Sequence, residues 1–384
     1  MKRAMALLAV CAAFVCAAAA MPPAGGGSLK DSLKDSLKDS LKYVSPGDIS
    51  IEDVFFSRFF ETIYNVDSTM HSQQVEAAAD IDTARWNREL AAMTLWGETS
   101  EPATDTYNAA VRMFLGSPQS DYADAAERAL YNGVLAALDT SRCHGEEWRR
   151  AAQAVLDAPA TAYASRGCDL WVNLYFRNRA YVKNDSLDMV ILQNTSAPWA
   201  GNVFISVKFN RPATRMRLHL RLPAWLRSRV TPSSRYSFSK AREFYQVVLN
   251  GRNLALRASA DGYITIDRVW QDDDVVRITM QTNVRRITDS AASGGDSAGK
   301  FAVQEGPVVY ALETRGERKF FDPQAAFGNN YDKEVLHANT LVTKGYSSPD
   351  TTADTPWSAV LVPYYIAFGR NAESSQLWLE KVSK

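Results

Sequence analysis

The sequence predicts an α+β fold in which a short helical segment, residues 48–165, precedes a mainly antiparallel β-sandwich, residues 166–384. A change of pattern along the chain carries this prediction. Apolar residues recur at helical spacing up to about residue 165, and from Asp169 onward they alternate with polar residues at a period of two. Short alternating strands that are separated by Gly, Pro, Asn and Asp are typical of an antiparallel sandwich.

The composition is that of a neutral globular protein. Of the 384 residues, 46% are hydrophobic and 11% aromatic, which is enough for a sizeable core and about two domains. The chain carries 43 basic and 43 acidic residues. Because nucleic acid and anionic membranes attract basic proteins, this balance argues against both as partners. No stretch after the first twenty residues is long and apolar enough for a membrane span.

The first twenty residues have the pattern of a secretory signal peptide. Lys2 and Arg3 precede an apolar run, and an Ala-x-Ala cleavage site falls at Ala18 to Ala20. We therefore expect export to the periplasm or the extracellular space, with residues 1–20 removed. Cleavage would leave two cysteines, Cys143 and Cys168, and the sequence is compatible with one disulfide between them or with two thiols.

A low-complexity linker, residues 21–47, follows the signal peptide. Four copies of Ser-Leu-Lys fill residues 28–42, and their leucines lie four positions apart. A short repeat between a cleavage site and a domain is typical of a solvated spacer, while the leucine spacing is also compatible with one packed helix. The folded part is expected to begin at Asp48.

Five helices are expected between residues 49 and 165. Their approximate ranges are 52–64, 73–93, 104–115, 120–137 and 145–157. The fourth has the clearest pattern, with Ala125, Leu130, Val134 and Leu138 at helical spacing and charged residues between them. Pro118 ends the helix before it.

The strands are predicted from alternation. In RMRLHLRLPAWL, residues 215–226, the arginines and His219 face one way, toward solvent, and the apolar residues face the other. The inward-facing set should be Leu218, Leu220, Leu222, Ile264 and Ile266. Asp272, Asp273 and Asp274 are expected to form a solvated turn and not a metal or acid/base cluster.

Six segments of the β-region carry a resemblance to a known family. In chain order they are DLWVNLYF (169–176), APWAGNVFISV (197–207), LRLPAWL (220–226), DGYITIDRVWQDDDVV (261–276), FAVQEGPVVYALE (301–313) and LVPYYIAFGRNAESSQLWL (361–379). This series resembles the C-terminal β-domains of glycoside hydrolase family 127, the β-L-arabinofuranosidase-type proteins. ISIEDVFFSRFFET (49–62) and RMFLGSPQSDYADAAERALYNGVLAAL (112–138) resemble helical parts of the same family. The resemblance implies that the helices are a short remnant of an (α/α)6-type barrel.

The resemblance also implies a zinc site in the helical part. The tetrapeptide GETS takes the place of a Glu-x-Cys motif, so Glu98 would be a zinc ligand and Ser100 replaces a cysteine. Cys143 and His144 fall near an adjacent cysteine pair of the family, which implies that both are metal ligands and that Cys143 is the nucleophile. Asp82 falls near the position of the acid/base Glu. In the family, zinc keeps a cysteine thiolate anionic for attack on the anomeric carbon, while a Glu protonates the leaving oxygen.

These residues also have a structural interpretation. Cys143 and His144 would then cap one helix, and Glu98 would stabilise the start of another. Three functions are compatible with the sequence: a glycoside hydrolase of reduced activity, a secreted relative that binds plant-type arabinose-containing glycans without hydrolysing them, and a secreted structural or interaction protein. Because two of three thiolate positions are lost, we expect at most weak hydrolysis.

Overall fold

The structure, a computed structural model, describes residues 40–77, 81–138, 145–211, 214–232, 235–239, 244–290, 296–314, 317–352 and 354–383. Within it, Leu41–Lys384 form one unit. The expected signal peptide and most of the expected linker lie outside the described residues. In the described part of the chain, no helix is long and apolar enough to cross a membrane.

The fold begins earlier than Asp48. Leu41, Tyr43 and Val44 are all buried, with 5%, 6% and 7% of their surface exposed. The strand β1 (Lys42–Tyr43) pairs with β3 (Tyr163–Arg166). The end of the predicted linker is therefore part of the fold, because its apolar side chains are buried there. The repeat pattern alone does not predict this burial.

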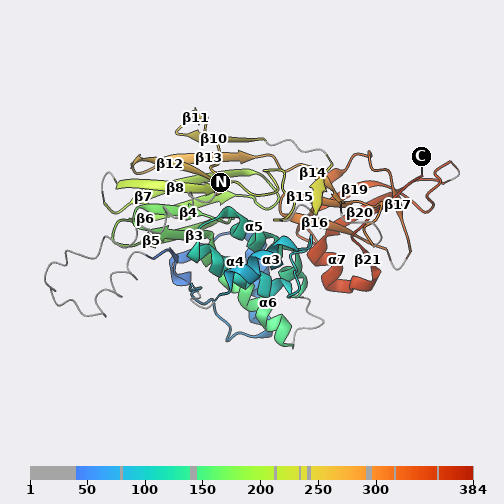
Figure 1. The fold of residues 1–384 in the computed structure, drawn as a ribbon, viewed down its shortest axis with the longest axis horizontal. Coiled ribbons are helices and arrows are strands. Elements are labelled where there is room, and N and C mark those ends of the chain that lie inside the picture. Colours follow the sequence, from blue (N-terminus) through green and yellow to red (C-terminus); the bar gives the residue numbers. More distant parts are fainter. Residues whose placement is uncertain are drawn as a thin grey trace, which may run out of the picture. The chain divides into compact units, whose positions relative to one another are not determined.

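Helices dominate the part of the chain before β3 (Figure 1). The α-helices of the described residues are α2 (Val54–Val66), α3 (Thr83–Ala91), α4 (Ala103–Gly116), α5 (Ser120–Ala129), α6 (Glu146–Asp157) and α7 (Tyr364–Asn371), joined by the short 3-10 helices η1 (Pro46–Asp48), η4 (Ala160–Ala162) and η5 (Ala372–Ser374) and the π-helical turn η2 (Leu130–Val134). Four of the five predicted helices are confirmed. The predicted helix at 73–93 is half wrong, because only its second half is helical and residues 71–77 have no regular structure.

Three sheets make up the remainder. The five-stranded sheet has the order β1, β3, β4 (Asp169–Val172), β8 (Thr214–Arg221), β12 (Tyr263–Trp270). The seven-stranded sheet has the order β11 (Arg252–Leu254), β10 (Tyr245–Leu249), β13 (Val275–Met280), β7 (Asn202–Phe209), β6 (Asp188–Thr195), β5 (Asn178–Lys183), β2 (Ile49–Ile51).

The third sheet has ten strands and comes from the C-terminal part of the chain. Its main path is β22 (Glu380–Lys381), β17 (Phe320–Phe321), β19 (Ala338–Tyr346), β20 (Trp357–Pro363), β16 (Val308–Glu313), β15 (Ala302–Glu305), β14 (Val284–Asp289), β9 (Tyr236–Phe238), with β18 (Gly328–Asp332) on β19 and β21 (Ser375–Gln376) on β16. Only β4–β8 and β17–β22 pair in parallel among the described strands. The α+β class and the mainly antiparallel pairing are therefore confirmed.

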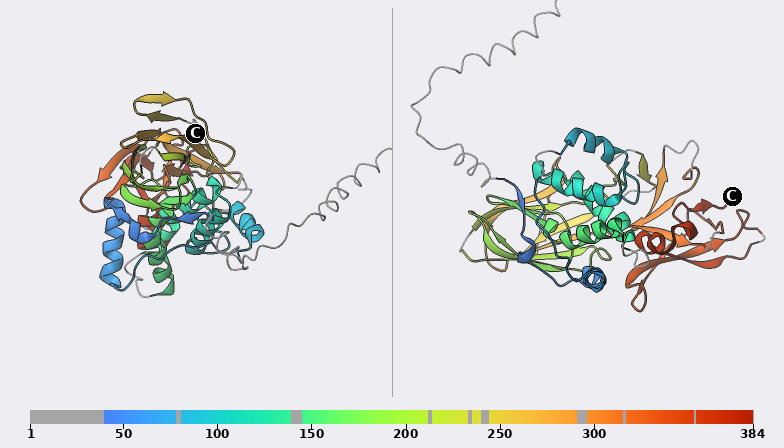
Figure 2. Two further views of the ribbon diagram at one scale, coloured as in Figure 1. Left: turned by 90° about the vertical axis from the view of Figure 1, so that its left-hand side faces the viewer. Right: turned by 90° about the horizontal axis from the view of Figure 1, so that it is seen from below.

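The predicted inward-facing residues belong to a core that also contains residues of the seven-stranded sheet. Figure 2 shows the strands of the five- and seven-stranded sheets as ribbons. Leu218, Leu220, Leu222, Ile264 and Ile266 are at most 6% exposed. The register pairs Ile264 with Leu220 and Ile266 with Leu218, so these side chains lie next to one another on one face. The same core contains Ile191 of the facing sheet. Alternation at a period of two predicted this layer correctly.

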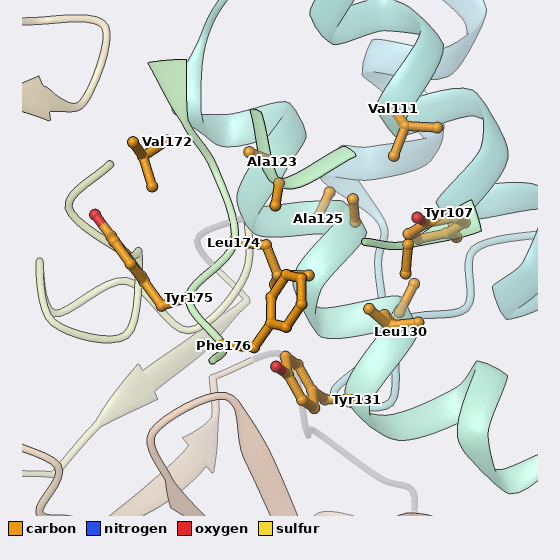
Figure 3. Close-up of a cluster of buried hydrophobic side chains, with 14 of the residues drawn as sticks. Tyr107, Val111, Ala123, Ala125, Leu130, Tyr131, Val172, Leu174, Tyr175 and Phe176 are labelled. Atoms are coloured by element: carbon orange, nitrogen blue, oxygen red, sulfur yellow. The ribbon is translucent and has the colours of Figure 1, made fainter. Parts of the chain in front are cut away.

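The helices pack on the segment that follows β4. Leu174 and Phe176 point toward the helices and meet Ala123, Leu130 and Tyr131 there (Figure 3). All five side chains are at most 8% exposed. Burial of large side chains at this contact contributes roughly 2 kcal/mol for each one. The helical segment is therefore part of the same core as the sheets.

Arg221 departs from the predicted alternation. It was expected to face solvent with the other arginines of β8, but its side chain is fully buried. Its guanidinium donates to Asp124 and Glu127 of α5 and to the Asn173 carbonyl oxygen. Arg227 adds a second cation, which donates to Asp124 Oδ2 at 2.5 Å. The expectation was wrong because α5 covers this end of the sheet and supplies the counter-charges.

His219 lies on the predicted outer face of the sheet, but only 12% of its side chain is exposed. Its ring stacks on Trp171, with the centroids 4.5 Å apart. Its two nitrogens contact Asp169 and Thr265, at 2.8 and 2.9 Å. The histidine is thus part of a cross-strand ladder on the outer face of the sheet, which is a structural role.

The three consecutive aspartates form the predicted turn, but only Asp272 and Asp273 are exposed to solvent. Asp273 has a φ of 64°, and Asp272 accepts a hydrogen bond from the Phe209 amide at 2.8 Å. Asp274 is buried and accepts from Gln271 and Asn250. The carboxylates are used to close the turn between β12 and β13.

We predict that Arg221→Leu destabilises the protein by about 3–5 kcal/mol, because it leaves the buried Glu127 without its cation and Asp124 with Arg227 alone. Arg215→Leu is the matched control on the same strand, where the pair with Asp267 is exposed and contributes about 1 kcal/mol or less. Urea unfolding of both variants measures the difference. Equal effects of the two substitutions would contradict a stabilising role for the buried cluster.

Candidate functional site: an aromatic cleft beside Glu98

Glu98 lies in the loop that joins α3 to α4. Thr94 closes this loop: its amide donates to the Glu98 carbonyl oxygen at 2.8 Å, and its hydroxyl accepts from the Glu98 amide at 3.0 Å. Gly97 has a φ of 92°, and a Cβ atom there would stand 2.3 Å from the Cα of Ala129. Only glycine combines this backbone conformation with so close an approach, so the loop lies directly on α5.

The π-helical turn η2 continues α5 at the point where this loop packs. The Gly133 amide donates to the Trp96 carbonyl oxygen at 2.9 Å. Asn132 accepts from the Val309 amide and donates to the Pro307 carbonyl oxygen, at 2.9 and 3.1 Å. The turn therefore connects the Glu98 loop with β16. Such π-helical turns inside helices occur often at functional sites.

The Glu98 carboxylate holds an aromatic stack in place. Its Oε2 accepts from the Trp96 indole nitrogen at 2.6 Å. The Trp96 ring lies nearly parallel to Tyr364, with centroids 6.0 Å apart, and Tyr364 stacks on Phe368 at 4.3 Å. Burial raises the pKa of Tyr364, and the neighbouring charge of Glu98 raises this pKa further. Glu98 thus fixes the orientation of the first of three stacked rings.

These three rings line a cleft of about 620 Å³. A second stacked pair, Tyr236 and Trp378, lines the same cleft, with ring centroids 6.1 Å apart. The cleft has the size of a small-molecule site and combines aromatic with polar lining groups. Flat aromatic faces pack on the C–H faces of a sugar ring, and carboxylates and amides accept or donate to its hydroxyls.

The three cations that line the cleft each have an anionic neighbour. Arg235 donates to Asp289 Oδ2 at 2.8 Å, and Lys300 and Arg318 each lie 3.7 Å from Glu380. Three cations and five carboxylates line the cleft, so its lining carries a net negative charge. Such a lining suits a neutral, hydroxyl-rich ligand better than an anion.

The structure places two predicted site residues outside this cleft. Asp82 is exposed and caps α3, since its Oδ1 accepts from the Arg85 amide at 2.9 Å. Ser100 donates its hydroxyl hydrogen to Glu89 Oε2 at 2.6 Å, and this bond lowers the pKa of Glu89. The capping geometry of Asp82 accounts for its position without an acid/base role.

The described residues do not fit a zinc ligand set on their own. Glu98 accepts the Trp96 indole hydrogen, and Ser100 is a neutral hydroxyl that is bonded to Glu89. Among the residues that the structure describes, no three His, Cys, Asp or Glu side chains gather in a way that could hold a metal ion. Cys143 and His144 lie outside the described residues. The zinc site that includes them therefore stays a prediction. Cys168 is half-buried and carries a free thiol.

Local sequence reasoning missed the aromatic residues that line the cleft. Tyr364 and Phe368 are spaced four apart on α7, a spacing that places them on one helix face, and Trp96 precedes Glu98 by two positions. These spacings were available signals. Tyr236 and Trp378 gave none, because they meet only through the pairing of the ten-stranded sheet.

Comparison with known families assigns most of the β-region. Residues 169–282 match the model of the β-L-arabinofuranosidase GH127 middle domain, and residues 285–380 match that of the glycoside hydrolase family 127 C-terminal domain. Together these ranges cover more than half of the chain. Both begin after the Glu98 loop, so they do not bear on the roles of the residues in it.

Individual relatives agree with this assignment. A non-reducing end β-L-arabinofuranosidase of Bifidobacterium longum subsp. longum is 23% identical over 256 residues, which are 57% of this chain and 36% of the relative. A solved GH127 β-arabinofuranosidase matches with a TM-score of 0.66 at 24% identity, over 73% of this chain and 48% of its own. A GH127 β-L-arabinofuranosidase from Geobacillus stearothermophilus T6 matches with a TM-score of 0.61 at 21% identity, over 75% and 51%. The structural matches show a shared fold, and the chain spans about half the length of these solved proteins.

We predict that Gly97→Ala destabilises the protein by at least about 2 kcal/mol, because it combines a left-handed backbone with a clash against α5. Gly116→Ala is the control, since a Cβ there meets nothing within 4 Å. Thermal unfolding of the two variants gives the comparison. If Gly97→Ala melted like the wild type, the close contact between the Glu98 loop and α5 would be disproved.

Proposed function

Because the chain belongs to glycoside hydrolase family 127, we propose that it recognises arabinofuranose-containing glycans and that the aromatic cleft beside Glu98 is the sugar-binding site. The three stacked rings of Trp96, Tyr364 and Phe368 carry this proposal. They supply a rigid apolar wall at little cost in side-chain entropy, since the rings already hold one another in place. Two of the related proteins described above are β-L-arabinofuranosidases, which supports this class of sugar as the ligand.

The proposed role of the chain is binding with at most weak hydrolysis. A thiolate nucleophile needs an environment that lowers its pKa, which a set of thiolate ligands around a metal provides. Here a serine stands at one ligand position, and its hydroxyl is bonded to Glu89. Fewer thiolate ligands weaken metal binding and leave less of any remaining thiol ionised at neutral pH. Hydrolysis through Cys143, with Glu98 and His144 as zinc ligands and Asp82 as acid/base, is the catalytic alternative.

Two further parts of the proposal concern the chain as a whole. The helices α2 to α6 are the remnant of an (α/α)6-type barrel, which accounts for their apolar faces against the sheets. The basic and apolar start of the sequence directs export, so the glycan is met in the periplasm or outside the cell. The proposed ligand is therefore a plant-type glycan with terminal arabinofuranose.

Calorimetric titration with methyl β-L-arabinofuranoside tests the binding site. We predict that Trp96→Ala weakens binding about tenfold or more, equivalent to about 1.4 kcal/mol, because the sugar loses one face of its wall. Trp86→Ala is the matched control, since Trp86 lies on α3, is also half-buried and does not line the cleft. Equal affinity of the Trp96 variant and the wild type would refute the placement of the site.

A chromogenic β-L-arabinofuranoside tests the catalytic alternative. The wild type, Cys143→Ala and Glu98→Gln are assayed with and without added zinc, together with the zinc content of the purified protein. Our expectation is turnover that is weak or absent in all three proteins. Robust turnover that either substitution abolishes would overturn the binding-only role and identify Cys143 as the nucleophile.

A further inference from the structure

A second cleft lies at the start of α2. It has a volume of about 430 Å³ and is formed by the first residues of α2, the turn between β6 and β7, and the hairpin of β18 and β19. This volume is in the range of small-molecule sites. None of its lining residues lines the aromatic cleft beside Glu98. The second cleft is therefore a separate candidate site, in a part of the molecule that the proposed function does not use.

Its walls include two aromatic side chains. Trp199 follows the turn after β6, and Tyr331 comes from β18 and is 40% exposed. Phe55 supports the tryptophan from behind, since the two rings meet edge to face with centroids 5.7 Å apart. Val54, which is 72% exposed, adds an apolar edge. Exposed apolar groups that line a cleft are typical of a ligand-binding surface.

The charges of this cleft differ from those of the aromatic cleft. Arg177 is exposed and lines the cleft. It forms no direct ion pair with a described residue, and its charge acts on the buried Asp53, which lines the same cleft. Glu52 also lines the cleft, without an ion pair to Arg177 or to another described side chain. A guanidinium in this position presents a planar pair of donors, the geometry that matches a carboxylate. The unpaired carboxylate of Glu52 accepts hydrogen bonds from hydroxyl groups.

The backbone around Arg177 is held rigidly. The buried Asp53 caps α2, because its Oδ1 accepts from the Phe56 amide at 3.1 Å, and its Oδ2 accepts from the Arg177 amide at 3.2 Å. The Glu52 amide in turn donates to the Arg177 carbonyl oxygen at 3.1 Å. Asp53 thus positions the backbone of Arg177, and it also lines the cleft.

The opposite side of the cleft is held by Arg58 of α2. Its guanidinium donates to the carbonyl oxygen of Leu336 and, at 3.0 Å, to the Tyr365 hydroxyl. His337, which follows Leu336 in the chain, has a φ of 49° and lines the cleft. Because α2 fixes both sides, a ligand meets a cleft that is already formed and loses little affinity to ordering it.

We infer that this cleft is a second glycan site, specific for a sugar unit that carries a carboxylate, a uronic acid. The sugar ring lies against Trp199 and Tyr331, its carboxylate pairs with Arg177, and Glu52 accepts from its hydroxyls. A single exposed guanidinium matches one carboxylate. A neutral sugar would offer this guanidinium no charge, and a densely charged anion would meet the repulsion of Glu52 and Asp53.

A matched pair of sugars tests this inference. Methyl α-D-galactopyranosiduronate and methyl α-D-galactopyranoside differ only in the carboxylate, so the ratio of their Kd values isolates its contribution. We expect the uronate to bind about tenfold or more tightly in calorimetric titration, and its advantage to shrink as salt is added. Arg177→Gln should abolish the preference, and Trp199→Ala should weaken binding of both sugars.

Two controls separate this site from other effects. Arg179→Gln removes an exposed arginine on β5 that does not line the cleft, so it should keep the full preference for the uronate. Trp96→Ala removes the wall of the other cleft and should leave uronate binding unchanged, whatever it does to arabinofuranoside binding. Melting curves confirm that each variant is folded. Equal Kd values for the two sugars, a preference that survives Arg177→Gln, or no binding of either sugar overturns the inference.

Discussion

The ion cluster around Arg221 connects the helical segment to the β-sheets, and the aromatic cleft depends on that connection. Arg221 is fully buried on β8, and Asp124 and Glu127 of α5 are at most 7% exposed. Charges in such an environment attract strongly, and each one also has hydrogen-bond partners. If α5 moved away from the sheet, two carboxylates and a guanidinium would lose their partners in a region that water does not reach. The cluster therefore fixes the position of α5.

The position of α5 in turn fixes the aromatic wall that contains Trp96 and Tyr364. Arg128, one residue beyond Glu127, donates to the Leu95 carbonyl oxygen at 2.9 Å and to Gln304 of β15 at 3.1 Å. The loop held in this way carries Trp96, whose ring stacks on Tyr364 of α7. Segments far apart in the sequence thus form one aromatic wall, which suits a neutral sugar. The exposed Arg177 gives the second cleft a different preference.

Sequence patterns predicted the elements better than their contacts. Alternation placed Leu220 in the core correctly, because one sheet face packs on a core wherever the strand lies. The same alternation put Arg221 in solvent, since nothing local shows that α5 supplies two carboxylates to that position. Likewise GETS identified Glu98, but the stacking of the neighbouring Trp96 on Tyr364 depends on how α7 packs. Cys143 lies outside the described residues, so its role stays a prediction.

The indole N–H resonance of Trp96 gives the most direct measure of where the sugar binds. In a nitrogen–proton correlation spectrum, Trp96→Phe identifies this resonance among those of the nine tryptophans. Because the indole hydrogen is bonded to Glu98 and the ring lines the cleft, titration with methyl β-L-arabinofuranoside should shift this resonance progressively to saturation. A sugar-dependent shift of other tryptophan resonances with Trp96 unchanged would contradict an arabinofuranose site in the cleft beside Glu98.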